Sequence, residues 1–177
     1  MKTLTLLRHA KSSWDDPVAR DFDRPLNAKG RRAAAMIGRH LKSLDITFDH
    51  ILASPAIRVM ETLDEVWGGY GRRLEPMWDK TLYLASAASL LDRVQALPDA
   101  AEHVLMVGHN PGLEDLVLDL TLASELRERV EDKYPTATVA QMTLPIDRWN
   151  EAQPHSATLV AFIRPRDLDP TLGPDTP

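Results

Sequence analysis

The sequence predicts an α/β protein in which a mostly parallel sheet is packed between helices. Short apolar segments typical of strands alternate with segments of helical periodicity through residue 123, and this alternation is typical of a sandwich built on a parallel sheet. At the predicted junctions from strand to helix, arginine and histidine recur. These observations set the fold class and indicate where its functional residues gather.

Length and composition fit one globular domain. The chain has 177 residues, of which 44% are hydrophobic and 27% charged, enough to bury a core. A net charge of −5 argues against nucleic-acid binding, and the absence of cysteine excludes disulfides and thiolate metal sites. The apolar stretch at the N-terminus is too short for a signal peptide. No stretch of the chain approaches the ~18 apolar residues of a membrane span. We therefore expect a soluble, cytoplasmic protein that does not bind a membrane.

The first predicted strand covers residues 3–7, which are short and apolar. The polar segment 11–25, with four aspartates and two prolines, is expected to form a long loop. Asn27 is a suitable N-cap for a helix that runs to about Leu44.

A second strand is predicted at residues 49–53. Ser54 and Pro55 follow directly, as a natural N-cap and first helical residue. The helix they open is expected to run to about Trp67 and to stop at Gly68-Gly69.

Further elements follow in the same alternation. We predict a short strand at residues 74–77 and a helix over 87–97 that Ser86 caps. The strongest strand signal covers residues 103–107, and Asn110-Pro111 then provides another cap and first turn.

The last third of the chain changes character. Residues 125–133 are highly charged and indicate a solvated helix or loop, while 138–144 and 158–163 are predicted to be neighbouring strands. Proline and aspartate dominate after these strands. We expect one domain over residues 1–166 and a disordered tail over 167–177.

Three strand-to-helix junctions carry the residues suited to chemistry: Arg8-His9, Ser54 to Arg58, and Gly108 to Pro111. In an open parallel sheet the carboxyl ends of the strands share one edge, and ligands bind there. We therefore expect the three junctions to meet although about 100 residues separate the first from the last.

The residue types at these junctions suit a phosphoryl group. Arginine offers a rigid fork of donors to phosphate oxygens, and helix N-termini add oriented N–H groups. A neutral imidazole can attack phosphorus and carry the group covalently. Arg58 near a helix N-terminus is locally unfavourable, which a bound anion explains.

Other histidines and acidic residues have plainer interpretations. His40, His50, His103 and His155 lack such a context and are expected to be structural or exposed. The clustered aspartates of the loop after His9 lack the spacing of a calcium loop, and no histidine pair has metal-site spacing. We therefore predict no metal and no organic cofactor.

Three motifs in order resemble the histidine phosphatase superfamily, also called phosphoglycerate-mutase-like. They are Leu7-Arg8-His9-Ala10, Ser54-Pro55-Ala56-Ile57-Arg58-Val59-Met60-Glu61-Thr62 and Val107-Gly108-His109-Asn110-Pro111. The alanine after His9, the run Asp23 to Asn27 with Gly30 after it, and the absence of a large insert after the Arg58 helix are similar to the short SixA-like phosphohistidine phosphatase branch. The resemblance covers about residues 2 to 165. It implies a three-layer α/β/α sandwich whose mostly parallel sheet has an antiparallel edge strand.

The resemblance also implies roles for single residues. His9 would accept the phosphate, Arg8 and Arg58 would hold its oxygens, and His109 would stabilise the transferring group. Arg24 corresponds to an arginine near the pocket mouth in the SixA-like branch, and so is a candidate substrate contact.

Three residues are further candidates. Ser12, in the loop after His9, is a second candidate substrate contact. Larger members of the superfamily use a carboxylic acid to protonate the leaving group, and Asp79 is its counterpart by order along the chain, with Glu75 as a second option. Such an acid needs a raised pKa.

The leading hypothesis is a metal-independent phosphatase that forms a covalent phospho-His9 intermediate. Its substrate would be a phosphomonoester or a protein phosphohistidine, such as that of a phosphorelay protein. Two alternatives stay open: a small-metabolite phosphatase or mutase-like enzyme, and a catalytically retired module that binds phosphorylated partners.

Overall fold

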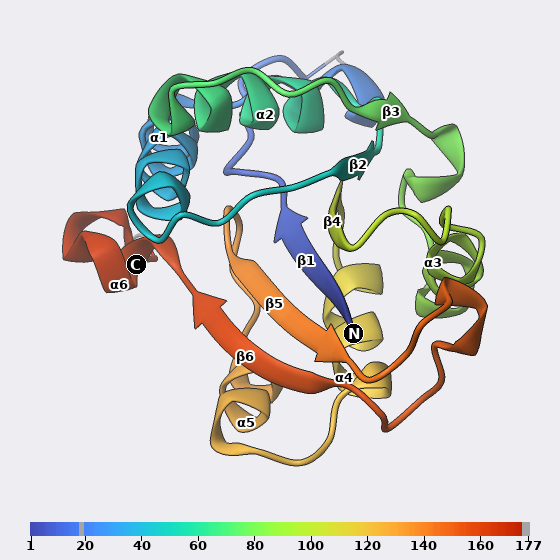
Figure 1. The fold of residues 1–177 in the computed structure, drawn as a ribbon. Coiled ribbons are helices and arrows are strands. Elements are labelled where there is room, and N and C mark those ends of the chain that lie inside the picture. The colour runs from blue at the N-terminus through green and yellow to red at the C-terminus, as the bar shows by residue number, and fades with distance from the viewer. Residues whose placement is uncertain (18–19, 175–177) are drawn as a thin grey trace.

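A six-stranded mixed sheet forms the centre of the computed structural model, which describes residues 1–17 and 20–174 (Figure 1). The strand order is β3-β2-β4-β1-β5-β6. The strands are β1 (Lys2–Arg8), β2 (His50–Ala53), β3 (Met77–Trp78), β4 (His103–Gly108), β5 (Val139–Leu144) and β6 (Thr158–Ile163).

Helices connect these strands in the predicted alternation. The α-helices are α1 (Ala28–Ser43), α2 (Ile57–Tyr70), α3 (Ala87–Gln95), α4 (Gly112–Leu120), α5 (Glu125–Asp132) and α6 (Pro165–Leu168). Short 3-10 helices lie at Asp21–Asp23, Lys80–Leu82, Trp149–Glu151 and Pro170–Leu172. Asn27 accepts a hydrogen bond from the Gly30 N–H, and Ser86 accepts one from the Ser89 N–H, which confirms both predicted caps.

The sheet is parallel from β3 through β2 and β4 to β1, and antiparallel beyond it. The reversed strand is β5, which pairs with β1 on one side and with β6 on the other. The predicted mixed sheet is confirmed, although the reversed strand lies one place inside the edge because β6 covers it.

Helices cover both faces of the sheet, so the molecule has the three predicted layers (Figure 1). Successive side chains of a strand point to opposite faces. In β4 the alternation places Leu105 and Val107 in the core beneath α1 and α2, while Val104 and Met106 belong to the core beneath α3 and α4.

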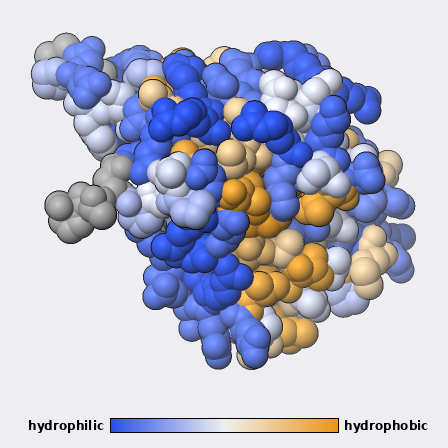
Figure 2. All heavy atoms as spheres, turned by 90° about the vertical axis from the view of Figure 1, so that its left-hand side faces the viewer, coloured by the Kyte–Doolittle hydropathy of each residue, from blue (hydrophilic) through white to orange (hydrophobic). Residues whose placement is uncertain are grey.

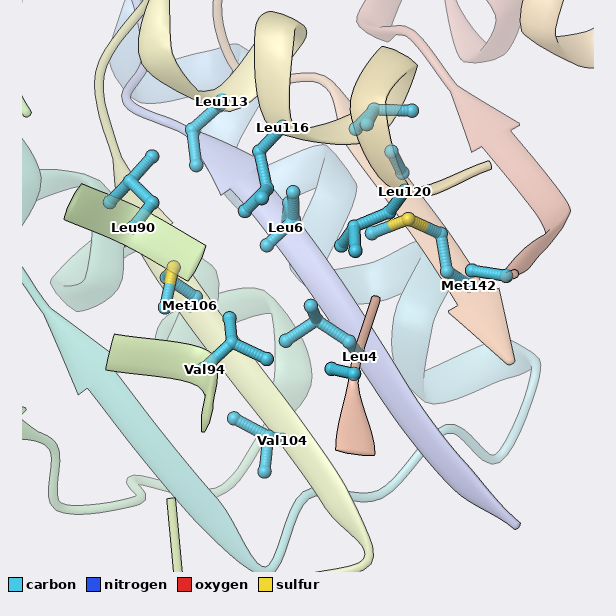
Figure 3. Close-up of a cluster of buried hydrophobic side chains, with 14 of the residues drawn as sticks. Leu4, Leu6, Leu90, Val94, Val104, Met106, Leu113, Leu116, Leu120 and Met142 are labelled. Carbon is cyan, nitrogen blue, oxygen red and sulfur yellow. The ribbon is translucent and has the colours of Figure 1, made fainter. Parts of the chain in front are cut away.

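The core beneath α3 and α4 is built from close-packed aliphatic side chains (Figure 3). Leu4 and Leu6 of β1 meet Leu113, Leu116 and Leu120 of α4, and all five are fully buried. This packing fixes α4, and therefore the loop that precedes it, against the carboxyl end of β4.

The start of α2 differs from the prediction. The helix begins at Ile57 with Ala56 as its N-cap, so Ser54 is not the cap. The hydroxyl of Ser54 accepts from the Ala56 N–H and contacts His109 instead. The Ser54 side chain, which the local pattern predicts as the cap of α2, makes a tertiary contact with His109 instead.

The end of α2 also differs, because the helix continues through Gly68-Gly69 to Tyr70. A Cβ at Gly69 would lie 2.0 Å from the carbonyl oxygen of Ala35 in α1. The missing side chain lets the two helices approach closely, which outweighs the low helix propensity of glycine. The helix stops at Gly71, whose φ of 79° is the left-handed conformation that glycine accepts readily.

Other boundaries shift by a few residues. The short strand predicted at 74–77 is β3, at Met77–Trp78, where it pairs with β2. The helix predicted from Pro111 begins at Gly112, and the Asn110 side chain accepts from the Glu114 N–H. The charged segment 125–133, for which the sequence indicates a helix or a loop, forms the helix α5.

The segment after residue 166 is folded as far as it is described. It contains the end of α6 and the 3-10 helix Pro170–Leu172, and Leu172 is buried in the core beneath α1. The prediction of a disordered tail does not fit residues 167–174, because an apolar side chain among the prolines found a place in the core. Residues 175–177 of the predicted tail lie outside the described residues.

Hydrophilic side chains cover most of the face that carries α1 and α6, and a band of hydrophobic residues crosses it (Figure 2). Among the described residues, no helix is long and apolar enough to cross a membrane.

Candidate active site

Three loops meet at the carboxyl ends of β1, β2 and β4, as the sequence predicts. The central strand β4 joins them through its backbone, because the Gly108 carbonyl accepts from the His9 N–H at 3.1 Å and the Val107 carbonyl accepts from the Ser54 N–H at 3.1 Å. The strand order β2-β4-β1 therefore brings together residues from positions 8 to 109 of the chain.

His9 is buried, with 8% of its surface exposed. Its Nδ1 lies 2.7 Å from the carbonyl oxygen of Ala10, which only accepts hydrogen bonds, so the neutral ring carries its proton on Nδ1. Burial lowers the pKa of His9 to about 3, the Ala10 hydrogen bond opposes this, and the charges of Arg58 and Arg8 add to the lowering. The ring is therefore neutral at pH 7, and its Nε2 presents a lone pair.

His109 is the second buried ring of the site, with its centroid 5.4 Å from that of His9. Its Nδ1 accepts from the Arg58 guanidinium at 3.3 Å, so its Nε2 carries the proton and donates to the Ser54 hydroxyl at 2.8 Å. Burial, and then the charge of Arg58, lowers the pKa of His109 to about 4. The two histidines thus have opposite tautomers.

Arg58 is 3% exposed and directs its guanidinium at the loop that follows His9. It donates to the backbone oxygen of Asp21 at 2.7 Å and to the Asp21 carboxylate at 3.0 Å. Thr62, one turn further along α2, accepts from the Ala10 N–H at 2.9 Å and donates to the Arg58 carbonyl. The helix therefore fixes both the arginine and the segment after His9.

Arg8 lies on the other side of His9. Its Nη1 donates to the carbonyl oxygen of Tyr134 at 2.9 Å, and its Nε is buried without a hydrogen-bond partner among the described residues. The Asn110 side-chain amide donates to the same Tyr134 oxygen at 3.0 Å. The backbone carbonyl of Tyr134 therefore helps to orient Arg8.

Asp21 is a site residue that sequence reasoning missed, since it was grouped with the solvated aspartates of the loop. Its carboxylate bridges Arg58 and Arg24, and it accepts from the Tyr83 hydroxyl. Burial raises the pKa of Asp21, but the hydrogen bonds from Tyr83 and Arg58 outweigh this and lower it overall. The spacing of three residues between Asp21 and Arg24 was a usable sequence signal, because it allows an ion pair across one turn.

The ionised carboxylate of Asp21 binds the Arg58 guanidinium, which is therefore positioned to bind an anion. Because Tyr83 also lies edge-on to the His109 ring at 5.3 Å, the anion lies among aromatic and cationic groups. A phosphate oxygen has the same charge and acceptor geometry as a carboxylate oxygen.

Arg24 and Ser12, the candidate substrate contacts, are brought together. The Arg24 guanidinium donates to the Ser12 hydroxyl, to the Ser13 carbonyl at 3.1 Å and to Asp21 at 2.9 Å. Trp14 is 74% exposed, and its ring centroid lies 3.1 Å from the Arg24 guanidinium carbon. These residues form a rim that Asp21 connects to Arg58.

The two candidate acids lie in different surroundings. Asp79 caps the 3-10 helix after β3, where its carboxylate accepts from the Thr81 N–H and hydroxyl and pairs with Arg93 at 3.7 Å. Glu75 is exposed and pairs with Arg73. None of these contacts involves His9 or Arg58. Over the described part of the chain, no group of three or more His, Cys, Asp or Glu side chains is placed to hold a metal ion.

The stability of the fold should depend on the two buried histidines. Each titrates near 6.5 when unfolded but at about 3 or about 4 when folded. Between these values and 6.5 the unfolded chain binds more protons, so the free energy of unfolding falls as the pH drops through this window. From pH 8 to pH 5 we expect a loss of about 2 kcal/mol per histidine.

Urea unfolding at a series of pH values measures this loss. His9→Gln should have a shallower pH dependence than the wild type, whereas replacement of the exposed His103 by Gln should keep the wild-type slope. Equal slopes in all three proteins would contradict the neutral state of His9.

Comparison with known proteins shows which class this fold and site define. Residues 4–82 match the histidine phosphatase superfamily (branch 1). An uncharacterized protein of Mycobacterium tuberculosis is 31% identical over 164 residues, which are 90% of this chain and 100% of that protein. The chain belongs to the histidine phosphatase superfamily, and it is a phosphatase.

Within the superfamily, the similarity lies with the SixA-like branch. A phosphohistidine phosphatase SixA homolog of Haemophilus influenzae is 28% identical over 153 residues, which are 81% of this chain and 90% of that protein. The structure of a Nakamurella multipartitia protein assigned as phosphohistidine phosphatase SixA has a TM-score of 0.78 and 28% identity, covering 93% of this chain and 96% of the other. The protein histidine phosphatase SixA complexed with tungstate has a TM-score of 0.78 at 22% identity, covering 94% and 99% of the two chains, and so shares the fold.

Proposed function

We propose that the protein hydrolyses protein phosphohistidine or a phosphomonoester through a phosphorylated His9. The contact between His9 Nδ1 and the Ala10 carbonyl is the observation that carries the proposal. The Nδ1 proton of His9 is held by the Ala10 carbonyl at 2.7 Å, which leaves the Nε2 lone pair for attack on phosphorus. A nucleophile that is neutral at pH 7 needs no general base to activate it.

The first step forms a bond between His9 Nε2 and phosphorus and breaks the bond from phosphorus to the leaving group, which keeps the electron pair. In this proposal Arg8 and Arg58 neutralise the phosphoryl oxygens, and Asp21 moves off Arg58 as the phosphate arrives. His109 stabilises the transferring group. Phosphoryl transfer depends mainly on such positioning and charge stabilisation.

In the second step water attacks the phosphorus of phospho-His9, the P–N bond breaks, and its electron pair returns to the ring. A proton of the water passes to a phosphoryl oxygen, so the product is dihydrogen phosphate. Apart from the substrate and water, both steps involve only side chains of this chain. The proposed route therefore uses no metal or organic cofactor.

Protonation of the leaving group depends on the substrate. An alkoxide needs a proton donor, and Asp79 is our proposed donor, as the family resemblance implies. An imidazole leaves more readily, so a phosphohistidine substrate places less demand on that acid. Arg24 and Ser12, at the rim, are proposed substrate contacts.

Two features favour a protein substrate over a mutase reaction. Mutases resembling this family carry extra segments that close over the substrate, whereas residues 71–76 alone join α2 to β3 here. The exposed Trp14 at the rim is accessible to a partner surface. We therefore place a phosphorelay protein first among candidate substrates.

Trapping the intermediate tests the proposal. The protein is mixed with a phosphohistidine-bearing phosphorelay domain or with p-nitrophenyl phosphate, quenched within one turnover, and digested at neutral pH for mass spectrometry. We expect acid-labile phosphate on His9 from at least one substrate, with a higher kcat/KM for the preferred one. Binding of the phosphorylated domain without label or turnover would instead indicate a retired binding module.

A further inference from the structure

A second basic region lies beside the catalytic histidines. It is a cavity of about 440 Å³, which is within the usual size range of small-molecule sites. Six of its lining residues are basic: Arg8, Lys11, Lys29, Lys133, Arg164 and Arg166. No carboxylate occurs among the lining residues that the structure describes, although the whole chain has a net charge of −5.

The sheet topology explains why these residues gather. In the antiparallel part of the sheet, Leu7 pairs with Val139, and Val139 pairs with Ile163. The end of β1, the start of β5 and the end of β6 therefore share the edge at which His9 lies. The cavity occupies this edge on the β5–β6 side, with α6 and residues 172–174 as its outer wall.

Arg8 connects this cavity with the catalytic residues. It precedes His9 in the chain and lines the cavity, and its Nη1 is held by the Tyr134 carbonyl. Burial lowers the pKa of Arg8, while Tyr134 and the Glu114 carboxyl favour its charged form. The charge of Arg8 also lowers the pKa of His9 and of His109, so one guanidinium acts on both regions.

The arginine and lysine side chains of the cavity differ in the partners that the protein gives them. Arg164 is bound to Asp167 at 2.8 Å, and Lys29 donates to the Gly173 carbonyl. By contrast, the Nε atoms of Arg8 and Arg166 are buried with no hydrogen-bond partner in the described part of the chain. Buried donors without partners are costly, and a bound anion would satisfy them.

The shape and the other lining residues indicate a small ligand. Apolar residues line the wall of the cavity between the cations, as is typical of a recessed small-molecule site. They are Ala33, Pro135, Pro165 and Leu172. Nucleic acids require an extended basic surface, which conflicts with the overall acidity of the chain.

We propose that this cavity is a second anion-binding site, which binds a phosphate group of a small molecule next to the catalytic pocket. The group could come from two sources: a second phosphate on the substrate bound at His9, or a separate small phosphate compound. The first source rests on the proposed function, whereas binding itself does not.

Calorimetry with pyrophosphate tests the site. Orthovanadate is added at the lowest concentration that abolishes turnover, so that the catalytic pocket is occupied, and pyrophosphate is then titrated. We expect one further pyrophosphate to bind. The double variant Lys133→Gln/Arg166→Gln should bind it at least about tenfold more weakly, because two of the six charges are removed.

A charge-matched control separates the site from a general electrostatic effect. Arg39→Gln/Arg72→Gln removes two exposed charges elsewhere and should bind pyrophosphate as the wild type does. If the first double variant does not fold, Lys133→Glu alone is the substitute, because Lys133 is exposed. All variants should keep wild-type turnover of p-nitrophenyl phosphate.

Kinetics then distinguish the two sources. If the second phosphate belongs to the substrate, Lys133→Gln/Arg166→Gln raises KM for an alkyl bisphosphate but not for the matching monophosphate. If it belongs to a separate compound, both KM values are unchanged while pyrophosphate binding is weakened. Absence of pyrophosphate binding, or equal binding by the double variant and the wild type, would overturn the proposal even if His9 is phosphorylated normally.

Discussion

Replacing His9 with alanine is expected to lower kcat by about 10⁴-fold or more while leaving the protein folded. The Nε2 lone pair of His9 is the proposed bond-forming group. Neither ring nitrogen of His109, the other buried histidine of the site, offers a lone pair that is free of a hydrogen bond. The Nε2 of His109 carries a proton that it donates to Ser54, and its Nδ1 accepts from Arg58. The second histidine is therefore not positioned to replace the first.

The measurement is steady-state turnover of an aryl phosphate together with single-turnover labelling. His103→Ala is the matched control, because His103 is exposed at the start of β4, far along the strand from its catalytic end. A His9→Ala protein that turns over within tenfold of the control would exclude His9 as the nucleophile. Circular dichroism and thermal unfolding of both variants show that the fold survives.

Replacing Arg58 with alanine should lower kcat/KM by about 10³-fold, since the transferring phosphoryl group loses a buried guanidinium that stabilises its charge. Arg58→Lys should recover only a part of this loss. Lysine keeps the charge but lacks the planar fork that contacts two acceptors at once, as Arg58 contacts Asp21.

A second measurement ties this loss to the geometry of the site. Burial and then the charge of Arg58 hold the pKa of His109 at about 4. In Arg58→Ala the charge is gone while much of the burial remains, so the pKa of His109 should rise, which NMR titration of the ring detects. Arg72→Ala, at an exposed position, is the control and should change neither value. An unchanged kcat/KM in Arg58→Ala would contradict the proposed role.

The elements that the sequence predicted well are those in which local pattern and burial agree. The apolar segments of β1 and β4 became central strands, and Asn27 and Ser86 cap their helices as expected. The α2 boundaries were predicted less well. There the contact between Gly69 and α1 and the bond between Ser54 and His109 override local preference.

The candidate site shows the same division. His9, Arg8, Arg58 and His109 were identifiable because each lies at or just after the end of a strand, and strand ends of a parallel sheet meet at one edge. Asp21 was not identifiable as a site residue, since its carboxylate is one of several in a polar loop. Its contact with Arg58 exists because the loop closes back on α1, where the Lys11 carbonyl accepts from the Asn27 N–H.

The sequence by itself determined the alternation of strands and helices, and with it the residues of the phosphate pocket. Periodicity and strand-end position are local properties, so they can be read without a structure. Tertiary structure alone decided the tautomers of His9 and His109, the contact of Asp21 with Arg58, and the basic cavity between the end of β1, the loop before β5, and α6. These features depend on which distant groups lie within hydrogen-bond reach, and only the packing of helices on the sheet sets those distances.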